Sequence, residues 1–154
     1  LPDPAFARLG GKPIEKIGEN VKNRYGRHGA DGASDGLQPK APGRRWVHRQ
    51  LFENFIIMEL KKQIAWSESK PQMFHFRTQT GQEVDIVLED RSGNLVGIEV
   101  KAGATVHGHD FKGLRALQEA TAGRFRRGIV IYTGTESIPF GEFMTALPVQ
   151  RLWG

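Results

Sequence analysis

Cysteine is absent from all 154 residues of this chain. Its absence excludes disulfide bonds, zinc sites built on thiolates and thiol nucleophiles, and it is typical of proteins kept in the reducing cytosol. Long apolar segments are also missing, because no run approaches the roughly 18 residues that span a bilayer and no signal peptide opens the chain. We therefore expect a cytoplasmic protein with no membrane partner. The first residue is Leu rather than Met, as expected of a fragment or a processed chain.

Negative charge is scarce in the amino-terminal third, and the excess of positive charge is confined there. Residues 1–50 contain 10 Lys and Arg against 5 Asp and Glu, whereas residues 51–154 contain 12 of each. A protein that binds duplex DNA usually presents a basic face of its own. The balanced charge of the larger part therefore weakens the case for a stand-alone nuclease without removing it, since balanced totals are compatible with a polarised surface.

Apolar residues are too few in residues 1–45 to build a core. One helix is expected there, from Pro13 to Gly26, and residues 26–43 have the composition of a flexible linker. We predict a flexible or loosely packed basic extension at 1–45, followed by a folded domain at 46–154. The apolar positions of the expected helix, at helical spacing, are Ile14, Ile17, Val21 and Tyr25.

A basic cluster lies where the extension meets the domain. Such a cluster either contacts phosphate or is the solvated approach to a helix, and we favour the solvated interpretation. Its members are Arg44, Arg45, His48 and Arg49.

The segment from Glu83 to Lys101 has the pattern of a β-hairpin, with two apolar runs that meet at a Ser-Gly-Asn turn. If residues 91–93 form a three-residue loop with its glycine in the left-handed conformation, Asp90 pairs with Asn94. A two-residue Ser-Gly loop would shift the pairing by one residue. Glycine at the third loop position favours the three-residue loop.

Counting outward from that loop, Asp85 lies opposite Glu99 and on the same face as Lys101. Two carboxylates in a half-buried strand pair repel each other, and a hard divalent cation such as Mg²⁺, or Mn²⁺ in its place, compensates. A lysine beside them can orient water or neutralise charge that develops at phosphorus. The alternative is an amphipathic strand with a Glu–Lys pair on its solvent face. With Asp85 aligned across the hairpin, we favour a site formed by Asp85, Glu99 and Lys101; whether these residues are catalytic is a separate question.

Residues 47–66 are expected to form the strongest helix. Glu53 lies on the flank of its apolar stripe and has two interpretations. It is either an ordinary first-turn glutamate favoured by the helix dipole, or a third metal-binding carboxylate that reaches the hairpin. The stripe consists of Phe52, Phe55, Ile56, Leu60 and Ile64.

The remaining elements alternate between strand and helix. Residues 73–78 read as a strand before the hairpin, and a helix capped by Asp110 and closed by Gly123 follows it. The wholly apolar run 128–132 is expected to be a buried strand, with a short final strand near 149–153. This order predicts an α/β fold in which a mixed central sheet is flanked by helices, with an irregular amino-terminal extension.

Six segments together resemble one family in the right order over about residues 50–154. They resemble an uncharacterised carboxy-terminal domain that follows an AAA-type ATPase module in many predicted bacterial and archaeal ATPases. That domain is similar to the PD-(D/E)XK, or restriction-endonuclease-like, superfamily, whose Asp…Glu-x-Lys motif is also seen in this chain. The segments are LFENFIIMEL, FHFRTQTGQEVDIVLE, LVGIEVKA, DFKGLRAL, RGIVIYTG and ALPVQRLW.

The resemblance implies a restriction-endonuclease-like fold and a Mg²⁺-dependent nuclease that hydrolyses phosphodiester bonds in nucleic acid. By motif, Glu53, Asp85 and Glu99 match the metal-binding acids, and Lys101 matches the catalytic lysine. The alternative is a non-catalytic module of the same fold that binds nucleic acid or protein and regulates a linked AAA-type ATPase.

Overall fold

The computed structural model describes residues 6–9, 12–16, 44–121 and 123–154. Its strands form one mixed sheet in the order β1-β2-β3-β4-β5-β6-β8-β7. The strands are β1 (Phe6–Leu9), β2 (Lys12–Lys16), β3 (Gln72–Arg77), β4 (Glu83–Glu89), β5 (Leu95–Lys101), β6 (Phe125–Tyr132), β7 (Ile138–Pro139) and β8 (Met144–Pro148). The helices are α1 (Arg44–Trp66) and α2 (Lys112–Ala120), with 3₁₀ turns η2 (Gly108–Phe111) and η3 (Val149–Leu152). The predicted α/β class and mixed sheet are confirmed.

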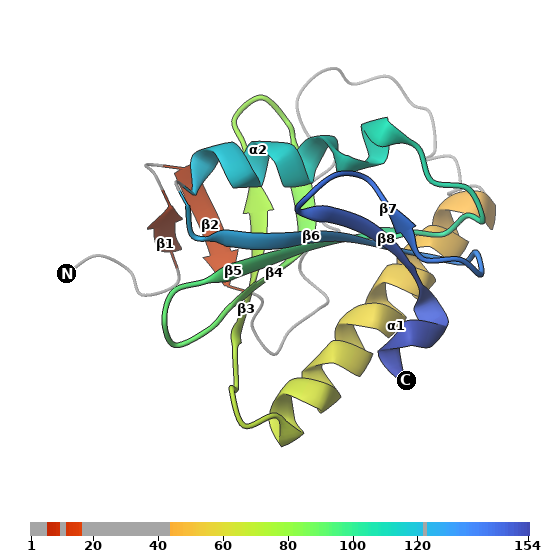
Figure 1. The fold of residues 1–154 in the computed structure, drawn as a ribbon, viewed down its shortest axis with the longest axis horizontal. Coiled ribbons are helices and arrows are strands. Elements are labelled where there is room, and N and C mark those ends of the chain that lie inside the picture. The colour runs from red at the N-terminus through yellow and green to blue at the C-terminus, as the bar shows by residue number, and fades with distance from the viewer. Residues whose placement is uncertain (1–5, 10–11, 17–43, 122) are drawn as a thin grey trace, which may run out of the picture.

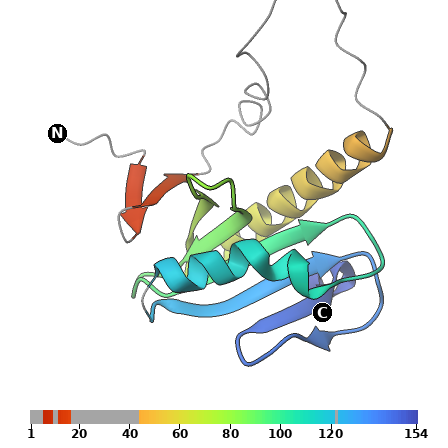
Figure 2. The same ribbon diagram turned by 90° about the horizontal axis from the view of Figure 1, so that it is seen from above.

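The two helices cover opposite faces of the sheet (Figures 1 and 2). The core beneath α1 contains Ile57 of the helix and Ile86 and Ile98 of the hairpin. The core beneath α2 contains Leu114 and Leu117, together with buried side chains of β3, β4 and β6. The central strands are therefore buried on both faces, which accounts for their nearly continuous apolar sequence. Across the described residues, no helix is long and apolar enough to cross a membrane.

The hairpin has the predicted register. Residues 91–93 form its loop, in which Gly93 has φ = 80°, and the Asp90 N–H donates to the Asn94 carbonyl at 3.0 Å. The Asp90 carboxylate also accepts hydrogen bonds from the Ser92 and Asn94 backbone N–H groups, at 2.8 and 2.9 Å. These bonds fix the loop length, and the strand pairing continues from Glu89↔Leu95 to Ile86↔Ile98.

β5, α2 and β6 form the expected crossover, since β5 and β6 are parallel neighbours in the sheet. Asp110 does not cap α2 as predicted, because it lies inside η2 and the residue that caps α2 is Phe111. The last strand is β8 at 144–148, earlier than the predicted 149–153, which forms η3 over Val149–Leu152.

Helix α1 begins three residues before the predicted start at 47 and ends at the predicted residue. The predicted apolar stripe is right for Ile56 and Leu60, which are buried, but Phe55 is 47% exposed. Phe55 lies beside Trp153, with ring centroids 5.9 Å apart, rather than under the helix. Glu53, by contrast, is buried.

The predicted helix from Pro13 is wrong over residues 13–16, the part of it that the structure describes. Lys12–Lys16 form β2, which pairs with β1 and, through Ile14↔Phe76, with β3. Without β2, β3 would be an exposed sheet edge, and pairing along that edge satisfies backbone groups that a short helix would leave unsupported. The rest of that predicted helix, and the linker at 26–43, lie outside the described residues.

Candidate active site

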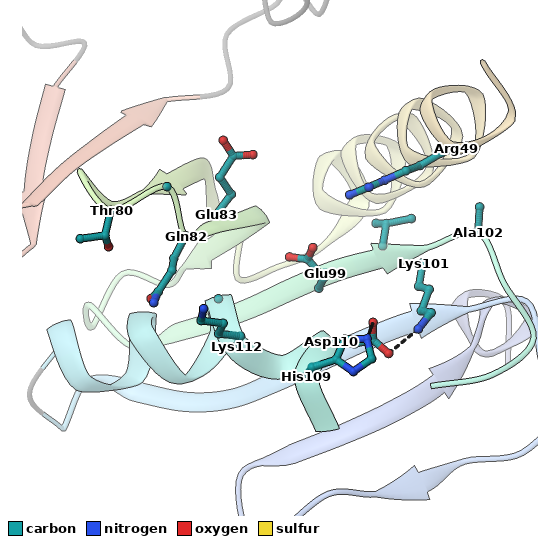
Figure 3. A pocket seen from close by; sticks show the side chains of 13 residues that line it. Arg49, Thr80, Gln82, Glu83, Glu99, Lys101, Ala102, His109, Asp110 and Lys112 are labelled. Carbon is teal, nitrogen blue, oxygen red and sulfur yellow. Dashed lines mark hydrogen bonds and ion pairs between the residues drawn. The ribbon is translucent and has the colours of Figure 1, made fainter. Parts of the chain in front are cut away.

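A pocket of about 490 Å³ lies at the carboxyl end of β5 (Figure 3). Five segments form its wall: α1, the turn between β3 and β4, the end of β5, η2 and the start of α2. Glu99 and Lys101 reach it from β5, as the alternation of a strand requires. The lining residues are Arg49, Thr80, Gly81, Gln82, Glu83, Glu99, Val100, Lys101, Ala102, His109, Asp110, Lys112 and Gly113.

Asp85 and Glu99 meet where the regular pairing of β4 and β5 ends. The Asp85 Oδ2 atom accepts a hydrogen bond from the Val100 N–H at 2.9 Å, and the Asp85 backbone in turn hydrogen-bonds the Glu99 carboxylate. The Asp85 side chain is buried. The cross-strand pairing that the sequence predicted therefore brings these two carboxyl groups together.

A β-bulge in β4 accompanies this arrangement. Phe74 of β3 pairs with Val87, but Phe76 pairs with Val84, so β4 has one residue more than β3 between these pairs. A bulge re-aims the side chains around it and strengthens the local twist. Asp85 and Ile86 are the two β4 residues between these pairs, where β3 has His75 alone, so Asp85 is part of the bulge.

Glu99 is in an unfavourable environment for a charged group. Its Oε2 atom is buried and has no hydrogen-bond partner among the described residues. Burial, followed by the negative charge of Asp85, raises the pKa of Glu99 well above its ordinary value, and Glu53 adds to the effect. The hydrogen bond from the Asp85 backbone and the positive charge of Arg49 act in the opposite direction. A carboxylate oxygen buried in this way is an available ligand for a cation.

Lys101 forms an ion pair with Asp110, drawn as a dashed line in Figure 3. The same carboxylate oxygen of Asp110 accepts a hydrogen bond from the His107 N–H at 2.7 Å. Burial works to raise the pKa of Asp110, but the hydrogen bonds from Lys101 and His107 outweigh it and hold the pKa below its ordinary value. The ammonium group is therefore held at the pocket wall on the side of η2.

Glu53 is buried on α1 and contributes to the electrostatic environment of Glu99, but it does not line the pocket. Asp85 is also absent from the pocket lining. Within the described part of the chain, no three or more His, Asp or Glu side chains form a group placed to hold a metal ion. The structure thus brings Asp85 to Glu99 directly, and relates Glu53 to them through its charge.

Residues 49–152 match the family described as "Domain of unknown function (DUF4143)". The chain belongs to this family. The comparison of the chain with curated proteins found no match.

Among solved structures, the DUF4143 domain is similar to a chain of a complex from Thermococcus gammatolerans, described as a refined half-complex from the tetradecameric assembly of McrB AAA+ hexamers with bound McrC. The TM-score is 0.45 and the sequence identity is 13%. The match covers 65% of this chain and 27% of the other. A likeness this distant carries no argument about function.

The charged side chains of the DUF4143 domain that line the pocket without having been singled out for it by the sequence include Arg49, Asp110 and Lys112. Arg49 was interpreted as solvated, but it lies one helical turn before Glu53, and that spacing places both on one face of α1. Figure 3 shows Arg49 reaching from α1 toward Glu99. The sequence marked Asp110 only as a helix cap and gave no signal for Lys112; η2 and the start of α2 bring these two residues to the pocket.

Proposed function

We propose that this pocket is the reaction centre of a Mg²⁺-dependent nuclease, with Mn²⁺ able to substitute, that hydrolyses phosphodiester bonds of nucleic acid. The observation that carries the proposal is the buried, unpartnered Oε2 atom of Glu99 beside Asp85. Two adjacent ionised carboxylates are costly to maintain, and the cost is removed by protonation of one of them or by a bound cation.

The residues fit a hard divalent cation in their chemistry. Mg²⁺ is commonly bound through one or two protein carboxylates, and water and phosphate oxygens complete its shell. Asp85 and Glu99 supply such a pair, and Glu53 is the third carboxylate, close enough for its charge to affect the pKa of Glu99. When bound, the cation supplies charge neutralisation at the phosphate and lowers the pKa of a bound water.

The protein groups have separate roles in the hydrolysis. The oxygen of a water forms a bond to phosphorus, the bond from phosphorus to one sugar oxygen breaks, and a proton from the water ends on the leaving alcohol. Lys101 stabilises the negative charge that develops at phosphorus, or orients the water. Asp110 is a positioning residue, because it holds the Lys101 ammonium at the pocket wall.

The second candidate is a non-catalytic module that binds nucleic acid or protein and regulates a linked AAA-type ATPase. It is favoured by the ion pair of Lys101 with Asp110, which engages the proposed catalytic ammonium group in a structural contact. The link to an AAA-type ATPase is implied by the resemblance of the sequence to domains that follow such ATPase modules. In this case the ATPase turnover of the linked protein would change on removal of the domain, while no nucleic acid would be cleaved.

A cleavage assay on the full chain separates the two candidates. Single-stranded and duplex DNA and RNA are incubated with Mg²⁺ or Mn²⁺, and Mn²⁺ binding is measured by calorimetry on the same protein. We expect cleavage and cation binding in the wild type, loss of both in Glu99→Gln, and loss of cleavage alone in Lys101→Ala. Arg91→Ala, at the hairpin tip, serves as a control that keeps activity. Cleavage that survives in Glu99→Gln, or its absence from the wild type on every substrate, contradicts the nuclease proposal.

A further inference from the structure

The charges around Glu99 do not cancel within the pocket. Glu83 forms an ion pair with Arg77, with Nε and Oε1 3.0 Å apart, and Asp110 forms one with Lys101. The acidic residues of the pocket wall, other than Glu99, are therefore already matched by cations.

Two cationic side chains of the pocket remain without such partners. Arg49 and Lys112 form no hydrogen bond and no ion pair within 4 Å among the described residues, and both are exposed. Arg49 attracts Glu99 only through its charge. Figure 3 shows the two side chains on different sides of Glu99: Arg49 reaches toward it from α1, and Lys112 lies at the start of α2 near Gln82.

Packing of α2 fixes the position of Lys112. A Cβ atom added at Gly113 would lie 1.9 Å from the Glu83 carbonyl oxygen, so the first turn of α2 lies directly against the start of β4. Only glycine allows this approach. Lys112 precedes that glycine and is thereby held at the rim of the pocket, beside the β3–β4 turn.

We propose that Arg49 and Lys112 form a phosphate-binding subsite that holds one nucleic acid strand across Glu99. The inference rests on the proposed function and deepens it, because it assigns the substrate class to a single strand. The guanidinium and the ammonium bind backbone phosphates on either side of the reacting one. The charges of both cations thus become matched only when the strand is present.

The shape of the site favours one strand over a duplex. The Glu99 carboxylate lies inside a pocket with walls on α1, on the β3–β4 turn and on the residues that begin α2, and its Oε2 atom is buried. A duplex presents its phosphates on a broad convex surface, and its binders carry an extended basic face. Residues 51–154 contain equal numbers of acidic and basic side chains, so this part of the chain has no excess of positive charge for an extended contact with a duplex. A single strand can enter such a pocket with its backbone.

Binding measured without any metal tests the subsite independently of catalysis. The full chain is titrated, in chelator, against a fluorescent single-stranded oligonucleotide and against the same sequence as a duplex, at several salt concentrations. Arg49→Ala and Lys112→Ala are compared with Arg91→Ala, which removes the same charge from the hairpin tip. We expect Arg49→Ala and Lys112→Ala each to weaken single-strand binding about 5- to 10-fold, and to reduce the salt dependence by about 0.7 in log–log slope per lost contact.

Further variants keep the result interpretable. Arg49→Lys and Lys112→Arg retain the charge and should keep most of the affinity, and thermal unfolding verifies that every variant is folded. Equal losses in Arg91→Ala and the two subsite variants, or duplex binding as tight as single-strand binding, would overturn the inference. Failure of the nuclease proposal alone gives a different result: the wild type cleaves no substrate, while Arg49→Ala and Lys112→Ala still weaken single-strand binding.

Discussion

The carboxylate of Asp85 accepts the hydrogen bond of the Val100 N–H, at 2.9 Å. Hydrogen-bonded pairs alternate along an antiparallel ladder, and the pairs of this hairpin continue from Asp90 and Asn94 to Ile86↔Ile98. The next such pair would join Val84 to Val100. The Asp85 side chain takes the place of the backbone acceptor for the Val100 N–H. The backbone pairing can therefore end at the site without leaving that buried N–H unpaired.

This relationship predicts different stability effects for two variants at Asp85. Asp85→Ala leaves the Val100 N–H without its acceptor and should lower the free energy of unfolding by about 1–3 kcal/mol. Asp85→Asn keeps a carbonyl oxygen for that N–H and should cost clearly less. Both should abolish Mn²⁺ binding, since neither retains the negative charge. Chemical denaturation measures the first effect and calorimetry the second; equal stability losses in the two variants would show that the hydrogen bond contributes little.

Glu99→Gln should stabilise the metal-free protein. Burial and the charge of Asp85 raise the pKa of Glu99 in the folded state. Below the unfolded-state pKa of about 4.5, Glu99 is neutral in both states, and its contribution to the free energy of unfolding is at its most favourable. That contribution is lost as the pH rises toward the raised folded pKa. In chelator at pH 7 we expect Glu99→Gln to be more stable than the wild type.

The pH dependence of the two proteins provides the control for that prediction. The difference in unfolding free energy between Glu99→Gln and wild type should grow as the pH rises above about 4.5 and level off above the folded pKa. A difference that stays constant between pH 4 and pH 8 would mean that Glu99 titrates normally.

Deletion of Ser92 tests whether the site depends on the register of the hairpin. The shortened loop should shift the pairing of β4 and β5 by one residue and turn one of the two carboxylates, Asp85 or Glu99, toward the opposite face. We expect cation binding to be lost while the far-ultraviolet circular dichroism changes little. Ser92→Ala keeps the loop length and should keep cation binding; if the deletion keeps it as well, the register does not decide the site.

Gly113→Ala should disturb the pocket through the backbone. The added Cβ meets the Glu83 carbonyl oxygen at 1.9 Å, and a backbone atom cannot rotate away. The first turn of α2 must then move, at a cost of about 1–3 kcal/mol or more in unfolding free energy, and Lys112 moves with it. The melting temperature and the single-strand affinity should therefore fall together.

Gly108→Ala is the matched control for that variant, because a Cβ there has no neighbour within 4 Å. It should change neither the melting temperature nor the affinity appreciably. A Gly113→Ala protein as stable as Gly108→Ala would contradict the close approach of α2 to β4.

The turn chemistry of the hairpin determined its register from the sequence alone. A glycine at the third loop position, together with the alternation of apolar residues, is a local signal, and it placed Asp85 against Glu99 correctly. The long helix and the central strands followed from periodicity in the same way. The prediction for Phe55 failed because the side of a helix that is covered depends on what packs against it, and Phe55 stays 47% exposed beside Trp153.

Tertiary structure alone decided the partners of the site residues. Lys101 pairs with Asp110, and Arg49 and Lys112 line one pocket with Glu99, only because α1 and α2 pack on opposite faces of one sheet. The bulge in β4 likewise depends on how β3 pairs with its neighbour. Such contacts join residues distant in sequence, and no local propensity encodes them. Pairing with β3 also overrode the helical spacing of residues 12–16.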